Sequence, residues 1–427
     1  MVKIGIAGLG TVGCGTLRLL QAHRELIAGR SGGPLLVSAV SARERNKDRG
    51  IDLAGVRWFE QADVMAADPE LDVVIELIGG SDGIAKSVVE AALAAGKHVV
   101  TANKALMAHH GAALARQAEE AGVTLAYEAA VAGGIPIIKA LREGLAANEL
   151  GCIYGILNGT CNYILSGMRD SGREFAEVLA EAQQLGYAEA DPSFDVDGVD
   201  TAHKLAILTA LCFGCEVDFD AVHVEGIREI SSLDIGFADE LGYRIKLLGV
   251  ARRTDGGLEQ RVHPTMVRAD APIAAIEGVF NAVVAEGDFV GSFMAEGRGA
   301  GAGPTASAVV ADVIDIARGS RLPTFAVPAT ELNRMATVSM AERYGSYYLR
   351  LMVLDQPGVI ADVAAVLRDQ EISVEALLQR GRAPGEAVPV VITTHETREA
   401  NLTMALERIA GLDAVLESPR MVRIEDL

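Results

Sequence analysis

The chain has 427 residues, of which 50% are apolar, and a formal net charge of -20 at pH 7. This length predicts two or three domains with cores of their own, and the apolar content excludes an intrinsically disordered protein. The negative charge argues against a nucleic acid or an anionic membrane surface as a partner.

The N-terminal sequence enters a strand pattern directly, which predicts no secretion signal. The longest apolar runs are far shorter than the roughly 20 residues that a bilayer span requires. The five cysteines show no framework of spacings. Cys212 and Cys215 form a CxxC at the end of an apolar helical run, which favours a buried structural pair over a zinc or redox site. We expect a cytoplasmic protein.

Residues 1–132 alternate between strand and helix patterns, which predicts an α/β fold with a Rossmann-type doubly wound parallel sheet. A helix near 304–319 is expected to complete this dinucleotide-binding domain. The predicted strands lie at 3–10, 35–40, 72–80, 98–103 and 123–131, and the predicted helices at 11–23, 83–97 and 105–122.

The pattern changes at Gly133. Residues 133–303 predict an α+β substrate and oligomerisation domain with an antiparallel or mixed sheet, including helices over 133–148 and 200–214. Residues 320–346 lack clear periodicity and are interpreted as a linker. Residues 347–427 follow a βαββαβ pattern, with a loop at 380–387, and are long enough for a small third domain.

The sequence GLGTVG places Gly8, Gly10 and Gly13 between the first strand and the first helix. Glycines here allow a tight turn and close approach to a pyrophosphate, while the helix offers free N–H groups. The second strand is followed by Arg43 rather than by an acidic residue. A guanidinium suits a 2′-phosphate, so we favour NADP over NAD, although a solvated basic loop is the alternative.

Two further loops follow predicted strands. Lys104 in TANK should face the cofactor crevice, although an ordinary surface lysine at a helix start is the alternative. In YEAAVAGGIP, two glycines and Pro136 expose carbonyl oxygens in a fixed loop. Such a loop can bind a hard monovalent cation, but the residues alone favour a domain hinge.

The segment GYAEADPSFDVDGVDTAHK holds five carboxylates and ends in Lys204. Asp200 and Lys204 are four apart, so they share one helix face and could form an ordinary surface pair. The helix is otherwise apolar around Lys204, which predicts a buried lysine with a lowered pKa, suited to acid–base chemistry. Asp195 and Asp197 are expected to cap the helix or to order the loop.

These segments, together with NGTCNYIL and GAGPTASAVVADV, resemble homoserine dehydrogenase over nearly the whole chain. The tail from Tyr347 resembles an ACT domain. The resemblance implies reversible reduction of L-aspartate 4-semialdehyde to L-homoserine with NAD(P)H, on the route to threonine, methionine and isoleucine. It also implies a homodimer or homotetramer and feedback inhibition by L-threonine through the ACT domain.

The resemblance assigns a role to each matching position. Lys204 and Lys104 match the catalytic lysines, and Lys204 would protonate the new alkoxide. Backbone oxygens of Glu128, Val131, Gly133 and Ile135 match a site for sodium or another monovalent cation. Substrate-binding positions are Asn158, Gly159, Thr160, Tyr187, Glu189, Asp195 and Asp200. Cofactor-binding positions are Gly8, Gly10, Thr11, Val12, Gly13, Arg43, Ile78, Gly79, Thr101, Ala102, Lys104, Gly186 and Gly303.

Two other functions stay open at this point. Aspartate-semialdehyde dehydrogenase would need a nucleophilic cysteine, for which Cys152 and Cys161 are the nearest candidates. A catalytically dead amino-acid sensor would use the ACT domain alone. The intact set of Glu189, Asp200 and Lys204 argues against the sensor.

Overall fold

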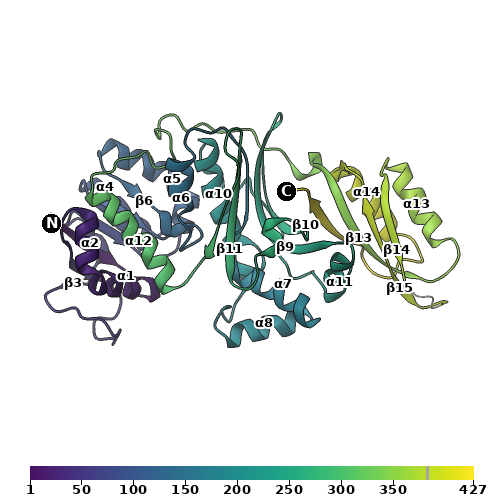
Figure 1. Ribbon diagram of the computed structural model, residues 1–427, viewed down its shortest axis with the longest axis horizontal. Coiled ribbons are helices and arrows are strands. Elements are labelled where there is room, and N and C mark those ends of the chain that lie inside the picture. The colour runs from purple at the N-terminus through teal and green to yellow at the C-terminus, as the bar shows by residue number, and fades with distance from the viewer. Residues whose placement is uncertain (381–383) are drawn as a thin grey trace.

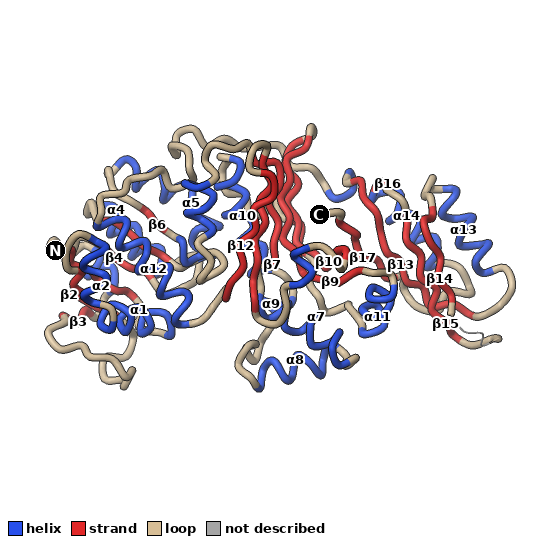
Figure 2. The backbone as a smooth tube through the Cα atoms, in the orientation of Figure 1, coloured by secondary structure: helices blue, strands red, loops and turns tan. Residues whose placement is uncertain are grey.

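The protein is described from a computed structural model over residues 1–380 and 384–427, so the predicted loop at 380–387 lies partly outside the described residues. Three bodies follow one another along its longest axis (Figure 1). The N-terminal α/β body lies at one end, a tall sheet stands in the middle, and the C-terminal α/β domain lies at the other end. Figure 2 shows that strands of the middle and C-terminal bodies run side by side.

The N-terminal body is built on a six-stranded sheet in the order β3-β2-β1-β4-β5-β6, in which every pairing is parallel. This confirms the predicted Rossmann-type sheet. The crevice of such a sheet lies at its switch point, where β1 meets β4. The strands are β1 (Val2–Ala7), β2 (Leu35–Ser41), β3 (Arg57–Phe59), β4 (Val73–Glu76), β5 (His98–Thr101) and β6 (Leu125–Ala126).

Both faces of this sheet are buried by helices. Successive residues of a strand point to opposite faces, so each strand contributes to two cores. In β4, Val73 and Ile75 face one core and Val74 faces the other. One face is covered by α1 (Thr11–Ala22), α2 (Arg24–Ser31) and α12 (Ala302–Ala317), and the other by α3 (Ala62–Ala66), α4 (Ile84–Ala94) and α5 (Lys104–Glu120).

Helix α12 returns to the N-terminal body after the chain has passed through the middle one. Its buried Val309 and Val313 share a core with Ile6 of β1 and Leu17 of α1. The backbones of α1 and α12 also approach closely, since a Cβ on Gly15 would lie 2.7 Å from the Ala302 carbonyl oxygen. The first domain therefore depends on a distant segment for one of its faces.

The middle and C-terminal bodies share one mixed sheet, which is eleven-stranded within the described residues. The middle body contributes the order β12-β11-β7-β9-β10. These strands are β7 (Leu150–Ile156), β8 (His223–Val224), β9 (Tyr243–Thr254), β10 (Gly257–Arg268), β11 (Phe280–Gly287) and β12 (Gly291–Arg298), with β8 paired to β10.

The predicted helix over 133–148 is wrong in length, because regular α-helix stops after one short turn. Residues Ile137–Lys139 form α6, and Ala140–Gly144 continue as a π-helical turn. A short 3₁₀ turn precedes it at Glu128–Ala130 and another follows β10 at Pro272–Ala275. The remaining helices of this body are α7 (Gly159–Ser171), α8 (Phe175–Gln184), α9 (Ser193–Val196), α10 (Val199–Phe213) and α11 (Ser232–Glu240).

The C-terminal domain has the predicted βαββαβ order. It contains β13 (Tyr344–Leu354), α13 (Val359–Asp369), β14 (Val374–Gln379), β15 (Ala387–Thr394), the short β16 (Thr397–Arg398), α14 (Glu399–Ala410) and β17 (Arg420–Glu425). Strand β17 pairs antiparallel with β13 and parallel with β10. It therefore joins the domain to the middle body through backbone hydrogen bonds, which the sequence pattern did not predict.

The segment between α12 and β13 packs against the rest of the chain. Phe325 is fully buried, and the Leu258 N–H donates to the Ala336 carbonyl at 2.8 Å. Apart from a 3₁₀ turn at Met340–Glu342, this segment lacks regular helix. None of the described helices combines the length and the hydropathy that a membrane span requires.

Candidate active site

The glycine turn after β1 forms a cradle at the switch point of the parallel sheet. Gly8 has φ +102°, and a Cβ there would lie 2.5 Å from the Leu77 carbonyl oxygen. A Cβ on Gly13 would lie 2.0 Å from the Gly8 carbonyl oxygen, whereas the space beside Gly10 is open. Gly10 begins α1 without a side-chain cap, so the helix N–H groups are open to an anion.

A cavity of about 480 Å³ lies beside this turn. Its size suits the nicotinamide end of a dinucleotide together with a small substrate. It has walls from both the N-terminal and the middle body. The lining residues are Val12, Gly79, Gly80, Ala102, Asn103, Lys104, Ala105, Ala129, Ala130, Ala132, Gly133, Phe194, Lys204, Gly299, Ala300 and Thr305.

Three further predicted cofactor positions, Ile78, Thr101 and Gly303, lie close to lining residues along the chain. Thr101 is buried at the end of β5, and Ile78 is 37% exposed in the loop after β4. Gly303 lies in the first turn of α12, close to the lining residues Ala300 and Thr305. A NAD(P)-sized ligand therefore fits the residues present, through glycines that admit close approach and two helices that begin at the cavity.

Arg43 is exposed just after β2, where a 2′-phosphate would be recognised. Sequence reasoning missed Arg49 in the same loop. Its side chain donates to the carbonyl oxygens of Leu9 and Glu44, at 3.3 and 2.5 Å. Arg49 thereby ties this loop to the glycine turn.

Two lysines that line the cavity hold a buried carboxylate between their ammonium groups. Lys204 Nζ, on α10, donates to Asp200 Oδ2 at 2.7 Å and to the Leu157 carbonyl oxygen at 2.6 Å. Lys104, the first residue of α5, forms an ion pair with Asp200 Oδ1. Asp200 is 2% exposed and Lys204 8% exposed, so the interpretation of this pair as an ordinary surface contact is wrong.

The start of α7 completes this cluster. The Asn158 side chain caps α7 by accepting from Cys161 N, and its Nδ2 donates to Asp195 and Asp200, both at 2.8 Å. Thr160 Oγ1 donates to the Tyr187 carbonyl oxygen at 2.8 Å. The predicted substrate positions around Asn158 and Asp200 are thus brought together.

The charges of the cluster depend on one another. Burial disfavours the Asp200 carboxylate, but Lys204 and Lys104 outweigh it and hold the pKa of Asp200 well below its ordinary value. Burial lowers the pKa of Lys204, and Asp200 opposes that shift. Burial and the neighbouring Asp200 raise the pKa of Asp195. A lysine with a lowered pKa is a competent proton donor and acceptor.

The acidic loop before α10 is only partly drawn into the cluster. Glu189 is exposed, and its backbone carbonyl accepts from Gln183 Nε2 at 2.9 Å. Gly186, with φ +75°, is likewise exposed on this loop. The prediction that Asp195 and Asp197 cap the helix is wrong, because the N-cap residue of α10 is Gly198 and no side chain caps this helix. The two residues order the loop instead, as the alternative stated.

The comparisons with known proteins divide the chain in the same way as the fold. Residues 8–128 match the homoserine dehydrogenase NAD-binding domain, residues 136–314 match the homoserine dehydrogenase catalytic family, and residues 347–411 match the ACT domain. The homoserine dehydrogenase of Pseudomonas aeruginosa is 47% identical over 435 residues, covering 100% of this chain and 99% of that protein. The chain belongs to the homoserine dehydrogenase family.

Solved structures of the family agree with this assignment. The crystal structure of a homoserine dehydrogenase from Thiobacillus denitrificans is 45% identical, with a TM-score of 0.94, and covers 100% of this chain and 98% of that one. A hyperthermophilic archaeal homoserine dehydrogenase in complex with NADPH is 25% identical, with a TM-score of 0.64, over 75% of this chain and 98% of that one. The chain is therefore an oxidoreductase with a NAD(P)-binding domain and an ACT domain.

The loop from Glu128 to Ile135, where the resemblance implies a cation site, is largely buried where the first two domains meet. Gly133 has φ +48°, and a Cβ there would lie 2.4 Å from the Gly299 carbonyl oxygen. The Glu128 carboxylate accepts from the backbone N–H groups of Ile138 and Lys139 at 2.9 Å each. The Ile135 carbonyl oxygen accepts from Ile137 N at 2.8 Å and keeps one lone pair for another partner.

Cys152 and Cys161, the two candidate nucleophiles, are poorly suited to that role. Cys161 is fully buried, and its Sγ donates to the Asp195 carbonyl oxygen at 3.2 Å. Burial raises the pKa of Cys161 well above its ordinary value, and it also raises that of Cys152 on β7. A thioester-forming dehydrogenase needs a low-pKa cysteine, so the geometry agrees with the family assignment. Cys212 and Cys215 are free thiols.

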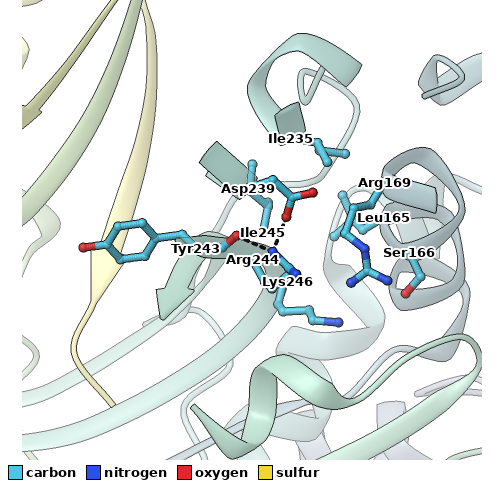
Figure 3. A pocket seen from close by; sticks show the side chains of 9 residues that line it. All are labelled: Leu165, Ser166, Arg169, Ile235, Asp239, Tyr243, Arg244, Ile245 and Lys246. Carbon is cyan, nitrogen blue, oxygen red and sulfur yellow. Dashed lines mark hydrogen bonds and ion pairs between the residues drawn. The ribbon is translucent and has the colours of Figure 1, made fainter. Parts of the chain in front are cut away.

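A second cavity lies between the C-terminal half of α7, helix α11 and strand β9 (Figure 3). Its volume of about 10 Å³ has room for roughly one water molecule. Arg169 and Lys246 direct their cationic ends toward it, but both are already paired with Glu277. This cavity is too small for a substrate, so the large cavity beside the glycine turn is the site.

Sequence reasoning missed two contacts in that site. The Phe194 ring, on α9, lies 5.2 Å from Lys104 Nζ and lines the cavity. A lone aromatic residue in an acidic loop gives no local signal of this role. The Leu157 carbonyl oxygen, which accepts from Lys204, is a backbone group that a residue pattern cannot reveal.

Replacing Asp200 by Asn should leave two lysines at a buried carboxamide. We expect the free energy of unfolding at pH 7 to fall by about 3 kcal/mol, because one partner of a buried ion pair is removed. Since the pKa of Asp200 is lowered on folding, the deficit should shrink as the pH falls below the ordinary value of 3.8. Urea unfolding followed by circular dichroism measures both quantities.

Asp197→Asn is the matched control. Asp197 lies three residues before Asp200, and its ion pair with Arg228 is exposed. It should change the free energy of unfolding by less than about 1 kcal/mol. Equal effects of the two substitutions would contradict the special role of Asp200.

Proposed function

We propose that the chain reduces L-aspartate 4-semialdehyde to L-homoserine, reversibly and with NADP preferred over NAD. The observation that carries this proposal is the Lys104–Asp200–Lys204 cluster, whose two lysines line a cavity with room for a nicotinamide and a small substrate. The product stands on the shared biosynthetic route to threonine, methionine and isoleucine. A cytoplasmic location fits the five free cysteines.

A nicotinamide bound in the cavity would supply the hydride. The chain itself must orient the aldehyde and handle the proton. Lys204 holds its ammonium beside Asp200, so it can stabilise the oxygen that gains negative charge and then donate a proton to it. Its lowered pKa eases that transfer, and Asp200 keeps the group charged enough to act.

The α-ammonium of the substrate needs an anionic partner. Asp200 and Glu189 are the proposed partners, and Lys104 would contact the substrate close to the nicotinamide. Asn158, Gly159 and Thr160 lie at the start of α7, where the helix N-terminus favours the substrate carboxylate. The carboxylates would thus bind the α-ammonium of the substrate, and Lys204 would serve the aldehyde oxygen at its other end.

The proton-donor role is tested by Lys204→Met in the NADPH-dependent reduction of L-aspartate 4-semialdehyde. We expect kcat to fall by about 10²–10⁴-fold, because the positioned acid is lost while the apolar stem is kept. Lys86→Met is the control, since Lys86 is a half-exposed lysine on α4 whose nearest acid is 3.9 Å away. A folded Lys204→Met enzyme with full turnover would leave Lys204 as only a structural partner of Asp200.

The preference for NADP rests on Arg43. Arg43→Ala should raise the KM for NADPH by about tenfold and leave that for NADH nearly unchanged, because only NADPH presents a 2′-phosphate. The loop itself should stay in place, since Arg49 anchors it through Leu9. Equal changes for both cofactors, measured under the same conditions, would contradict the 2′-phosphate role.

We further propose that the loop from Glu128 to Ile135 binds sodium or another monovalent cation through backbone oxygens. The left-handed, tightly packed conformation at Gly133 supports this cation site.

The chain is also proposed to form a homodimer or homotetramer. Analytical ultracentrifugation would establish the number of subunits.

L-Threonine is the proposed effector of the ACT domain. A chain of contacts supports its action on the active site. Arg423, on β17, donates to both carboxylate oxygens of Glu225, at 2.7 and 2.8 Å. Ile227 lies two residues after Glu225, and its backbone N–H donates to the carbonyl oxygen of Val196, the last residue of α9, at 2.9 Å. Helix α9 carries Phe194 and Asp195, which contact Lys104 and Asn158.

Glu225→Gln should raise the L-threonine concentration for half-inhibition by about tenfold, because one oxygen of the bidentate pair is lost. Glu229→Gln is the matched control, since Glu229 pairs with Arg420 at the exposed edge of the same junction. A wild-type enzyme that L-threonine does not inhibit would exclude this effector. Equal inhibition of wild type and Glu225→Gln would exclude the link.

A further inference from the structure

The catalytic roles leave one fully buried carboxylate of the N-terminal domain without an assignment. Glu76 is the last residue of β4 and is 0% exposed. Its Oε1 accepts from the backbone N–H groups of Ile78 and Gly79, at 2.6 and 3.2 Å. Its Oε2 accepts from Thr101 Oγ1, at the end of β5, at 2.6 Å. Three donors from two neighbouring strand ends therefore converge on one side chain.

These contacts continue into a closed ring. Thr101 Oγ1 accepts from Asn103 N at 3.0 Å, and Asn103 Nδ2 donates to the Gly80 carbonyl oxygen at 2.7 Å. The ring thus runs from Glu76 through Thr101 and Asn103 to Gly80 and back along the loop. It ties the loop after β4 to the turn between β5 and α5.

Both tied segments are walls of the cofactor cavity. Gly79 and Gly80, in the loop after β4, line the cavity, and so do Ala102 and Asn103, in the turn after β5. Gly79 and Gly80 have φ +89° and +87°, so this loop has a conformation that glycine adopts readily and that needs outside contacts to select it. The turn at Gly8 also rests on this loop, because a Cβ there would meet the Leu77 carbonyl oxygen at 2.5 Å.

A carboxylate is a costly choice for this position. Burial of a charged group is unfavourable, and here it raises the pKa of Glu76 above its ordinary value. The advantage of a carboxylate is its geometry, because an ionised carboxylate accepts hydrogen bonds at both oxygens and can hold donors on two sides at once. Glutamine, with the same shape, accepts at one end only and would face a donor with a donor at the other.

We propose that Glu76 is a positioning residue for the dinucleotide: it fixes the Ile78–Gly80 loop against the turn that ends β5, so that both walls of the cavity are in place before the cofactor binds. Glu76 acts through backbone N–H groups and through Thr101, and does not touch the cofactor itself. Preorganisation of this kind improves affinity, because the bound ligand need not order the loop.

Direct titration of NADPH and NADH into the enzyme, followed by nucleotide fluorescence without substrate, tests this role. Glu76→Gln should raise the Kd for NADPH by about tenfold, since one or two hydrogen bonds of the ring are lost. Thr101→Val should raise it as well, because Glu76 loses its donor from β5. Following both nucleotides makes the test independent of the preference for NADP.

The double variant distinguishes one shared ring from two separate defects. If Glu76 and Thr101 act together, Glu76→Gln combined with Thr101→Val should bind little worse than the weaker single variant. A loss equal to the product of the two single losses would overturn the proposal. An unchanged Kd in folded Glu76→Gln would overturn it too.

Two measurements separate positioning from general instability. Glu90→Gln removes one carboxylate of the same domain, from a side chain of α4 that is 42% exposed, and should leave the Kd unchanged. Circular dichroism and the unfolding midpoint report the folded fraction, and the Kd is evaluated for that fraction alone. Should Glu76→Gln not fold, Thr101→Val decides, because the Thr101 side chain is 0% exposed and its hydroxyl is bonded to Glu76 and Asn103 rather than open to the cavity. A raised Kd then supports the ring, and an unchanged Kd overturns it.

Discussion

The site depends on one buried negative charge. Asp200 comes from the middle domain, and its two counter-charges come from different places, Lys204 from the same helix and Lys104 from the first turn of a Rossmann-domain helix. A carboxylate buried to this degree is tolerated only with close cationic partners, so its presence requires the two domains to meet at this point. The constraint sets the position of Lys204, the proposed proton donor, at the wall of the cavity. The proposed substrate chemistry and the domain packing therefore depend on the same contact.

Local periodicity predicted the elements well and their long-range partners poorly. The alternation of strands and helices, the glycine turn and the four-residue spacing of Asp200 and Lys204 are local features, and the structure agrees with each of them. The parallel pairing of β17 with β10 joins segments far apart in the chain, and neither strand pattern specifies the other. The same holds for Phe194 beside Lys104 and for the Leu157 carbonyl oxygen beneath Lys204. Helix 133–148 was overestimated because its apolar spacing does not report the π-helical turn that ends it.

Charged groups are concentrated where the ACT domain joins the middle domain. Arg423 lies between the carboxylates of Glu225 and Glu399, and Glu425 accepts from both Arg261 and Arg343. Buried networks of this kind are weak sources of stability, but mispairing leaves charges without partners. They therefore favour one register of β17 on β10. A junction with a single register can transmit a small movement, which a loosely packed hydrophobic contact would absorb.

The return of α12 to the first domain has a consequence for how the chain folds. Ile6 and Leu17 cannot complete their core until Val309 and Val313 pack against them. The whole middle domain lies between these two pairs in the sequence. Contacts of such high sequence separation are slow to form, because the entropy of closing a long loop must be overcome first. The first two domains are then expected to gain their final cores together rather than in sequence. Until that moment, the part of the nucleotide sheet that α12 covers stays exposed to solvent and open to misassembly.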